Sequence, residues 1–470
     1  MTRISKALFV GTLMCLTALY LKLPILASGT ESKYLSLTSD MNVVSNSPVF
    51  TNVLETTISL PRAQWVYVQS DGGIEPSGTS LAWLEIYIDQ VRISNSSTID
   101  WRGSSNAVAH SFNCIGAKYL SAGSHTIQLQ ASKKGSGTYK IKAKSNLSIM
   151  TDPAPTVLVS SLSSDAGPYN FNTTSQNCLN SHPNLSVLAQ NVGLTSPQVI
   201  ISLASGRSYK TTASGDAMWG IFHNGTYPGN NAASWSVNDL FEGAELQAPM
   251  YNHAYVSGVT GNNSMTLRAS EYPWIDQNTQ NTVVYKIGAT TKLISLTGMQ
   301  VKGKGTAGGH NCTYYFTDWK AVGTGPEGTV SECSQFPECS PTEPRTCGTT
   351  DRPCTGTDVL LASGTISIPA GHSGVVMIVA KTHLQGDSCD NGSTARLKIK
   401  LDGSWVGSEG LQQTKCPNGE SQRIMGASYL ATGLSQGNHS VQVYGRIDLA
   451  STDSVRHISM TRYLPLIWFD

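Results

Sequence analysis

Hydrophobic and polar residues alternate along several short segments of the chain. Segments 84–89 and 396–402 both carry an aliphatic residue at every second position. A period of two over six or seven residues is typical of an antiparallel strand with one buried face. Similar runs bounded by Gly, Ser, Asn and Pro recur along the chain, and helical periodicity is scarce after the N-terminal segment. The pattern therefore predicts an all-β fold.

A weak internal repeat organises these segments. Segments 57–61 (TISLP) and 365–369 (TISIP) each precede one of the two alternating segments, and the turn–strand segments 119–129 and 434–443 follow them. Strand-like segments resemble one another by chance, but the preserved order favours true repetition. The first and third parts of the chain are therefore predicted to share one fold.

A middle copy of the repeat is fainter. It places segments 199–203, 261–267 and 283–296 in the same order. Three modules suit a chain of 470 residues, because domains commonly have about 150 residues. The predicted organisation is a signal peptide at 1–29, a first β-sandwich at 50–152, a linker at 153–189, a second β-sandwich at 190–300, a Cys-rich connector at 301–356 and a third β-sandwich at 357–470.

The N-terminus has the pattern of a secretory signal peptide. Arg3 and Lys6 precede an apolar run over 7–21, and small residues at 27–29 provide a cleavage site. An uncleaved anchor is the alternative, but a bilayer span needs roughly 18–20 apolar residues and Lys22 interrupts any extension of the run. We therefore predict a secreted, extracellular protein with no membrane span after signal cleavage.

Cysteine usage agrees with secretion. Nine cysteines follow the signal peptide, and five of them lie within 312–354, a segment with few apolar residues. Their spacings exceed those of zinc knuckles, so disulfides are predicted in place of a zinc site. Cys389 and Cys416 form a candidate disulfide, and Cys114 with Cys178 is a second candidate. The odd total leaves one thiol free or paired between chains.

Composition and charge argue against two classes of protein. Lys and Arg total 32 and Asp and Glu total 31, and no basic run interrupts this balance. A net charge of +1 argues against nucleic acid as a partner. Charged residues make up 13% and hydrophobic residues 39% of the chain, which argues against a disordered protein.

The order of segments resembles that of jelly-roll β-sandwich modules. TISLP (57–61), YLSAGSHTIQLQA (119–131) and SNLSIM (145–150) follow one another as in C1q/TNF-like domains, and carbohydrate-binding β-sandwich modules share this texture. The chain lacks the dense aromatic pattern and the collagen-like stalk of C1q-like proteins. The resemblance covers about two thirds of the mature chain. It implies tandem antiparallel jelly-roll-like β-sandwiches with a disulfide-rich connector, and an extracellular binding or assembly role, but it transfers no ligand residues.

The chain carries no recognisable catalytic constellation. It has neither a G-x-S-x-G elbow nor an H-E-x-x-H motif, and Glu85 lies on the polar side of its segment, where solvent is expected. Segment 387–393 is rich in oxygen ligands but lacks the order of a calcium loop. His125 and His439 take matching places in the repeat, after a turn, where a structural role is expected. We expect no catalytic residue, cofactor or metal.

Tryptophans and sequons point to surface roles. Trp101, Trp235 and Trp274 lie in polar, turn-like segments, so they are the candidates for stacking on a sugar. Three other tryptophans adjoin predicted strands and are expected in the core: Trp83, Trp405 and Trp468. The candidate glycosylation sites are Asn95, Asn146, Asn172, Asn184, Asn224, Asn262, Asn311, Asn391 and Asn438.

Together these features predict a secreted, non-enzymatic protein for extracellular binding, adhesion or surface assembly. Its expected partner is an extracellular glycan, a protein or another copy of the chain. Two alternatives stay open. A structural matrix or filament subunit would account for the repeats and the odd cysteine, and a jelly-roll polysaccharide-active enzyme would require a catalytic acid.

Overall fold

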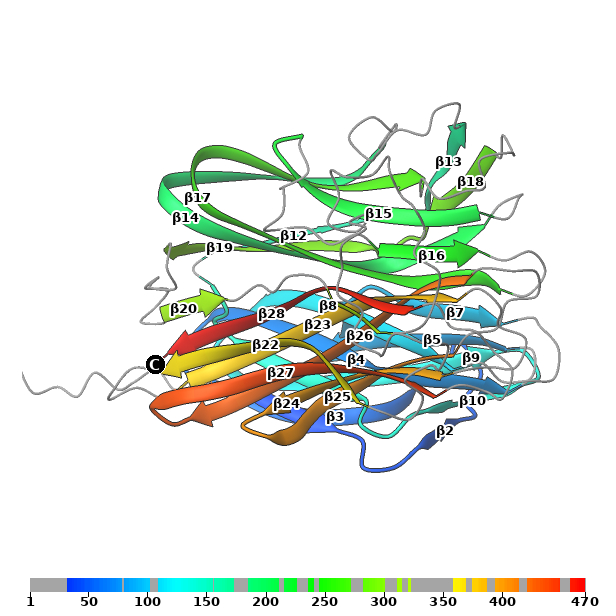
Figure 1. Ribbon diagram of the computed structural model, residues 1–470, viewed down its shortest axis with the longest axis horizontal. Helices are drawn as coiled ribbons and strands as arrows, with labels where there is room; N and C mark the ends of the chain where they lie inside the picture. Colours follow the sequence, from blue (N-terminus) through cyan, green and yellow to red (C-terminus); the bar gives the residue numbers. More distant parts are fainter. Residues whose placement is uncertain are drawn as a thin grey trace, which may run out of the picture.

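The protein was analysed as a computed structural model, and all regular secondary structure in the described residues is β-strand (Figure 1). This confirms the all-β prediction. The predicted signal peptide lies outside the described residues. The structure describes residues 32–77, 80–101, 109–154, 156–172, 185–210, 215–225, 236–240, 245–271, 282–300, 311–314, 320–322, 358–368, 374–386, 394–413, 421–448 and 457–469.

The first sandwich packs two antiparallel sheets face to face. One sheet has the order β1-β11-β4-β10-β2, with β8 also paired to β4, and the other has the order β7-β5-β9-β3, with β6 paired to β5. Aliphatic side chains from both sheets fill the space between them, including Ile58, Ile86, Leu129 and Ile149. The strands are β1 (Lys33–Ser36), β2 (Met41–Val43), β3 (Thr51–Leu60), β4 (Gln64–Ser77), β5 (Ser80–Ile88), β6 (Val91–Arg92), β7 (Ser97–Trp101), β8 (His110–Leu120), β9 (Gly123–Lys134), β10 (Thr138–Ile141) and β11 (Asn146–Thr151).

The second sandwich is built around one long antiparallel pair, β14 with β17. Strands β17 and β7 also pair, which joins this sandwich to a sheet of the first. Two of its strands, β12 and β13, come from the segment 153–189, for which the sequence predicts a linker. The apolar run 157–159 in this segment forms part of β12 and pairs with β19. The strands are β12 (Thr156–Ser161), β13 (Ala166–Asn172), β14 (Leu185–Lys210), β15 (Gly215–His223), β16 (Ser236–Leu240), β17 (Glu245–Glu271), β18 (Thr282–Ile287) and β19 (Lys292–Gln300).

The third sandwich again has two antiparallel sheets. Their orders are β20-β28-β23-β26, with β21 paired to β28, and β22-β27-β24-β25. Strands β20 and β21 come from the segment that the sequence suggests is a Cys-rich connector. The strands are β20 (Asn311–Tyr314), β21 (Lys320–Val322), β22 (Val359–Ile368), β23 (Gly374–Gly386), β24 (Thr394–Leu401), β25 (Ser404–Gln413), β26 (Ser421–Leu434), β27 (Gly437–Asp448) and β28 (His457–Phe469).

The first and third sandwiches repeat the same strand register. Ile58 pairs with His125 between β3 and β9, and Ile366 pairs with His439 between β22 and β27. The next strand is also in register, because β5 joins β9 as β24 joins β27. The middle copy does not follow this arrangement. Segment 199–203 pairs with β17 near His253 and not with 261–267, the segment that takes the place of 123–129 in the order of the repeat. Alternation identifies a strand but not its neighbour.

A histidine–aspartate pair, which we call the turn clasp, holds the same turn in both sandwiches. Asp89 and Asp402 begin the turns after β5 and β24 with positive φ angles of 51° and 50°. His125 Nδ1 lies 2.7 Å from Asp89 Oδ2, and His439 Nδ1 lies 2.7 Å from Asp402 Oδ2. The other ring nitrogen of each histidine lies 2.9 Å from a serine carbonyl four residues earlier. The two histidines are therefore structural, as their sequence positions predict.

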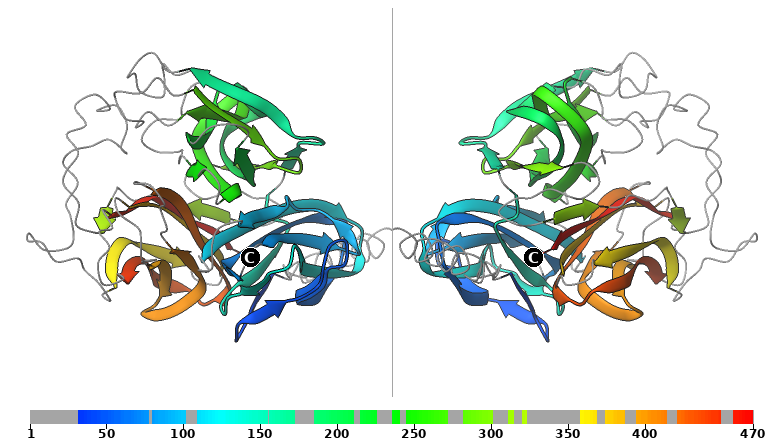
Figure 2. Two further views of the ribbon diagram at one scale, coloured as in Figure 1. Left: turned by 90° about the vertical axis from the view of Figure 1, so that its right-hand side faces the viewer. Right: turned by 90° about the vertical axis from the view of Figure 1, so that its left-hand side faces the viewer.

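The three sandwiches share a junction. Figure 2 shows the first (blue to cyan) beside the third (yellow to red), with the second (green) lying across both. An apolar cluster takes side chains from all three, including Tyr67, Ile201 and Met377. Next to it, the buried Asp71 carboxylate accepts hydrogen bonds from Gln69, Asn113 and, across the contact between the first and third sandwiches, from Ser428. Burial raises the pKa of Asp71, and these three donors only partly oppose that effect.

Candidate ligand-binding site

The shared register defines four pairs of matched positions on the polar faces of two sheets. The positions lie on β5, β6 and β9 in the first sandwich and on β24, β25 and β27 in the third. Their side chains differ completely in chemistry. The matched pairs are Glu85 with Lys398, Tyr87 with Lys400, Arg92 with Trp405, and Gln130 with Tyr444.

In the third sandwich these positions form an aromatic and cationic cluster. The Lys400 Nζ atom lies 4.3 Å from the ring centroid of Trp405 and 4.9 Å from that of Tyr444. Lys398 Nζ lies 5.0 Å from the same Trp405 centroid. The two rings meet edge to face, with centroids 5.1 Å apart. Cations at this range are attracted to the electron-rich face of an aromatic ring. We call these four residues the Trp405 cluster.

Trp405 is exposed, so the prediction that it lies in the core is wrong. Its exposed fraction is 44%. It follows the turn after β24 and lies opposite Lys400 on the polar side of the sheet, while Leu397 and Ile399 fill the core. Trp83 is partly buried, and the side chain of Trp468 lies outside the described residues.

A bulge in β25 shapes the neighbouring surface. The register shifts between Leu397 and Ile399, and Gly407 adopts a φ of 78°. A Cβ atom at Gly407 would lie 2.6 Å from the Ser428 carbonyl oxygen, so a glycine is required where β25 passes β26. The bulge brings Glu409 to the first sandwich, where its carboxylate lies 3.1 Å from Lys144 Nζ.

A pocket of about 390 Å³ lies beside the Trp405 cluster, between the first and third sandwiches. Its volume is in the range of small-ligand sites. Tyr34 and Tyr429 form part of its wall, with ring centroids 5.0 Å apart. Lys398, Trp405 and Glu409 also line it. Aromatic surface and charged side chains thus meet in one concave site.

The acidic groups of this region are already paired. Asp358 Oδ1 lies 2.7 Å from Lys398 Nζ, and Glu409 Oε1 lies 3.0 Å from Arg396. Burial raises the pKa of Glu409, but the hydrogen bond from Arg396 and the charge of Lys144 outweigh it and hold the pKa below its usual range. Within the described part of the chain, no carboxylate pairs with Lys400.

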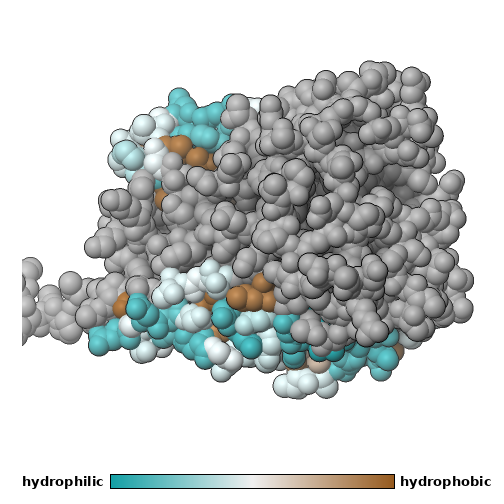
Figure 3. All heavy atoms as spheres, in the orientation of Figure 1, coloured by the Kyte–Doolittle hydropathy of each residue, from teal (hydrophilic) through white to brown (hydrophobic). Residues whose placement is uncertain are grey.

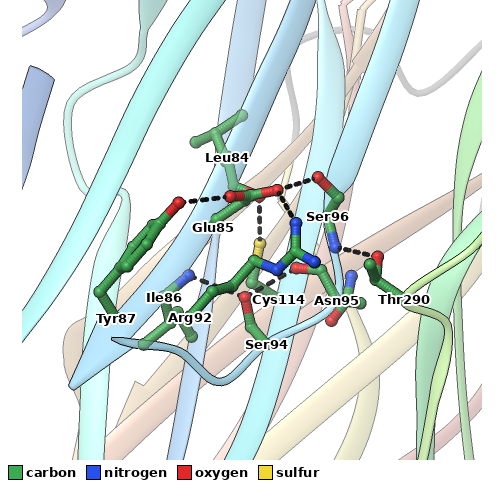
Figure 4. Close-up of polar contacts among 10 residues, drawn as sticks. All are labelled: Leu84, Glu85, Ile86, Tyr87, Arg92, Ser94, Asn95, Ser96, Cys114 and Thr290. Carbon is green, nitrogen blue, oxygen red and sulfur yellow. Dashed lines mark hydrogen bonds and ion pairs between the residues drawn. The ribbon is translucent and has the colours of Figure 1, made fainter. Parts of the chain in front are cut away.

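Three of the four matched residues of the first sandwich, Glu85, Tyr87 and Arg92, form a polar contact instead (Figure 4). Glu85 accepts hydrogen bonds from Tyr87, at 2.8 Å, and from Ser96, and its Oε1 atom lies 3.1 Å from Arg92. The Ser96 backbone N–H donates to Thr290 of the second sandwich at 2.9 Å. Glu85 is therefore buried, and the expectation that it faces solvent is wrong.

The second sandwich brings further cations to this contact. Burial, together with the charge of Arg92, lowers the pKa of Lys292 to about 8. Burial also lowers the pKa of Arg207, and the charge of Asp165, followed by those of Tyr209 and Glu85, opposes that effect. Glu85 thus balances positive charge from both sandwiches.

The sequence-predicted stacking residues fall at the edge of what the structure describes. Trp101 ends β7, where its backbone pairs with Ser80 and Glu245, and its side chain lies outside the described residues. Trp235 and Trp274 also lie outside them. Their stacking role stays a prediction, and the structure adds Trp405, whose position in the hydrophobic pattern gave no sign of exposure.

The candidate glycosylation sites differ in accessibility. Asn95 and Asn146 are buried, and their side-chain nitrogens donate to the carbonyls of Asn113 and Ser428 inside the protein, so a glycan has no room there. Three sequon asparagines are exposed: Asn224, Asn262 and Asn438. The side chains of the other four lie outside the described residues: Asn172, Asn184, Asn311 and Asn391.

The cysteine predictions have one correction. Cys114 is a free thiol, fully buried, and its Sγ atom lies 3.2 Å from the Leu84 carbonyl oxygen. A link from Cys114 to Cys178 is therefore wrong, because the thiol points into the core of the first sandwich. Burial raises the pKa of this thiol. Cys389 and Cys416 lie outside the described residues, so their pairing stays a prediction.

The described residues form neither a metal-ion site nor a membrane-spanning helix. No group of His, Cys, Asp and Glu side chains there is arranged to hold a metal ion. No helix there has the length and apolarity for a membrane crossing.

Figure 3 shows the described residues along the lower edge of the molecule as mainly hydrophilic, with small hydrophobic spots.

Comparisons with known proteins give only distant likenesses. No protein-family model and no curated protein sequence matches the chain. The chain is similar to the structure of infectious bursal disease virus Gx strain, with 9% identity, 91% of this chain and 79% of that chain covered, and a TM-score of 0.17. It is also similar to the CBM22-1-CBM22-2 tandem domain from Paenibacillus barcinonensis Xyn10C, with 9% identity, coverages of 55% and 92%, and a TM-score of 0.16. The ANX2 ectodomain from Arabidopsis thaliana matches with 8% identity, coverages of 65% and 90%, and a TM-score of 0.17. At TM-scores this low the likenesses carry no argument about function.

Proposed function

We propose that the protein is a secreted, non-enzymatic binding protein that holds a glycan against Trp405. The observation that carries the proposal is the exposure of this ring beside a pocket lined by Tyr34, Tyr429 and Glu409. Tryptophan combines a large apolar surface with a polar N–H group, which makes it common at binding surfaces. An indole face next to hydrogen-bonding side chains suits a pyranose, which offers a C–H face and hydroxyl groups.

The test is a glycan array probed with the secreted protein and with Trp405→Ala. We expect glycan binding by the parent protein and at least a tenfold loss of affinity in the variant, or about 1.4 kcal/mol. Tyr119→Ala is the matched control, because Tyr119 is also an exposed aromatic residue but does not line the pocket. Unchanged binding by Trp405→Ala, or the absence of any bound glycan, would contradict the proposal.

The oligomeric state separates this proposal from a structural subunit. A binding protein is expected to remain a discrete species in light scattering coupled to size exclusion, with or without reductant. Large assemblies that collapse on reduction would favour the matrix or filament alternative, in which an unpaired cysteine links chains.

A further inference from the structure

We infer that the ligand of the Trp405 cluster is an anionic saccharide, whose carboxylate or sulfate group binds Lys400 while its sugar ring packs beside Trp405. This inference rests on the proposed function and narrows its ligand class. The juxtaposition that carries it is an ammonium group 4.3 Å from the centroid of an exposed indole ring, beside a pocket.

The first step is the charge at Lys400. Its neighbours on β24, Arg396 and Lys398, have carboxylate partners in Glu409 and Asp358. The Lys400 ammonium lies over the rings of Trp405 and Tyr444, and in the described ranges no carboxylate forms an ion pair with it. An exposed cation–π contact contributes about 0.5–1 kcal/mol and leaves the ammonium able to bind an anion.

The second step is that the fold does not require these cations. Glu85 and Tyr87 occupy the matched positions in the first sandwich, with the same strand register. The whole chain has a net charge of only +1, so a general excess of basic residues does not explain them. Lysines at both positions are therefore a property of this face and not of the scaffold.

The third step is the placement of the two ammonium groups. Lys398 Nζ and Lys400 Nζ lie 5.0 and 4.3 Å from the centroid of one indole ring, so they share the same aromatic neighbour. Asp358 neutralises Lys398, which leaves the charge of Lys400 without a carboxylate partner in the described ranges. An anion bound at Lys400 would accept charge-assisted hydrogen bonds, which are roughly twice as strong as neutral ones.

The ligand chemistry follows from these contacts. An uncharged saccharide could use the ring but would leave Lys400 unpaired. An inorganic anion could use Lys400 but would leave the ring exposed. Only a ligand with both a C–H face and an acidic group uses the ring, the ammonium and the adjoining pocket together.

The experiment compares polymers that differ only in charge. The probes are hyaluronate with its carboxyl-reduced form, and dextran sulfate with dextran, each titrated at low and high NaCl. The proteins are the parent, Lys400→Gln, Lys400→Tyr and Lys140→Gln. Lys400→Tyr introduces the residue that the first sandwich carries at the matched position, and Lys140 is an exposed lysine on β10, away from the cluster.

We expect the charged member of at least one pair to bind about tenfold more tightly than its uncharged form. Both Lys400 variants should lose that preference, Lys140→Gln should keep it, and added salt should reduce it. Thermal melting serves as the check that each variant is folded.

Three other outcomes have distinct meanings. Equal, Trp405-dependent binding of charged and uncharged polymers would overturn the anionic ligand and leave the proposed function standing. Anion binding that Lys140→Gln weakens as much as Lys400→Gln does would also overturn the anionic ligand, because binding would then be non-specific. The absence of any Trp405-dependent glycan binding would overturn the proposed function itself.

Discussion

The β5–β9 sheet of the first sandwich and the β24–β27 sheet of the third have the same register, the same turn clasp and opposite surface chemistry. On the first, Glu85 pairs with Arg92 and is buried next to the contact with the second sandwich. On the third, Lys398 and Trp405 take the same positions and face the pocket. The inward positions are aliphatic in both, so the core maintains the repeat while the polar face changes.

The difference shows how one strand arrangement can carry two kinds of surface. Residues at every second position fix the sheet, and the residues between them touch whatever lies outside it. In the first sandwich these outward-facing residues lie against the second sandwich. In the third sandwich they lie beside a pocket, which is where we place the ligand.

The largest expected effect comes from breaking the covered face. We predict that Glu85→Ala lowers the free energy of unfolding by about 3 kcal/mol, because it leaves Arg92, Tyr87 and Ser96 without their buried acceptor. The matched substitution Lys398→Ala should cost less than about 1 kcal/mol, because the partner that it leaves behind, Asp358, is partly exposed and can be solvated. Urea unfolding at pH 7 measures both. Equal losses would contradict the contrast, and Glu85→Gln, which keeps a hydrogen-bond acceptor, should fall between the two.

The turn clasps should have equal effects in the two sandwiches. His125→Ala and His439→Ala each remove two hydrogen bonds of matching length, so each should cost about 1 kcal/mol. Chemical unfolding of the single variants at pH 6 tests this prediction. A loss of stability in only one of the two variants would show that the clasps share a geometry but contribute unequally to stability.

The pH dependence of the clasps sharpens the same point. Burial lowers the pKa of each histidine, but the aspartate bond outweighs it and the net pKa lies above 6.5. Burial raises the pKa of Asp89 and Asp402, but the histidine bond outweighs it and the net pKa lies below 3.8. The contribution of each histidine to the free energy of unfolding is therefore fully present below pH 6.5 and is lost as the pH rises through its folded pKa. The contribution of each aspartate is present above pH 3.8 and is lost as the pH falls through its folded pKa.

The stability difference between the parent protein and the double variant H125A/H439A should therefore be greatest between about pH 4 and 6.5 and should shrink above that range. Unfolding titrations at half-unit pH intervals measure it. A difference that grows toward pH 9 would contradict the assignment of the clasps.

The smallest expected effect on stability comes from the exposed face. Trp405→Ala and Lys400→Tyr should each change the free energy of unfolding by less than about 1 kcal/mol, because Trp405 is half-exposed and Tyr87 occupies the position matched to Lys400. Melting curves beside binding titrations separate the two roles. A large loss of stability would show that the cluster supports the fold.

The amino-acid sequence predicts much of this architecture. Alternation at 84–89 and 396–402 identifies the two matched strands and their buried faces, and the matching turn–strand segments locate His125 and His439. These features are local, because the side-chain period and the turn chemistry are set by neighbouring residues. They suffice for the all-β class and for the first and third sandwiches.

The site could not be predicted in the same way. Alternation places Glu85 and Lys398 on polar faces, but it does not say that the second sandwich covers the first of them. The exposure of Trp405 depends on the register of β24 with β25, and the pocket depends on β25 lying beside the first sandwich. Contacts between modules arise from long-range packing, which no local pattern records.

The most direct test of the account is hydrogen–deuterium exchange of the secreted protein, with and without a saturating amount of its best-bound saccharide. We predict added protection in peptides from β24, β25 and β27, and none in the matched strands β5, β6 and β9. Protection of the first sandwich alone, or of neither sheet, would contradict the claim that the two copies of one scaffold have separated into a buried contact and a ligand-binding face.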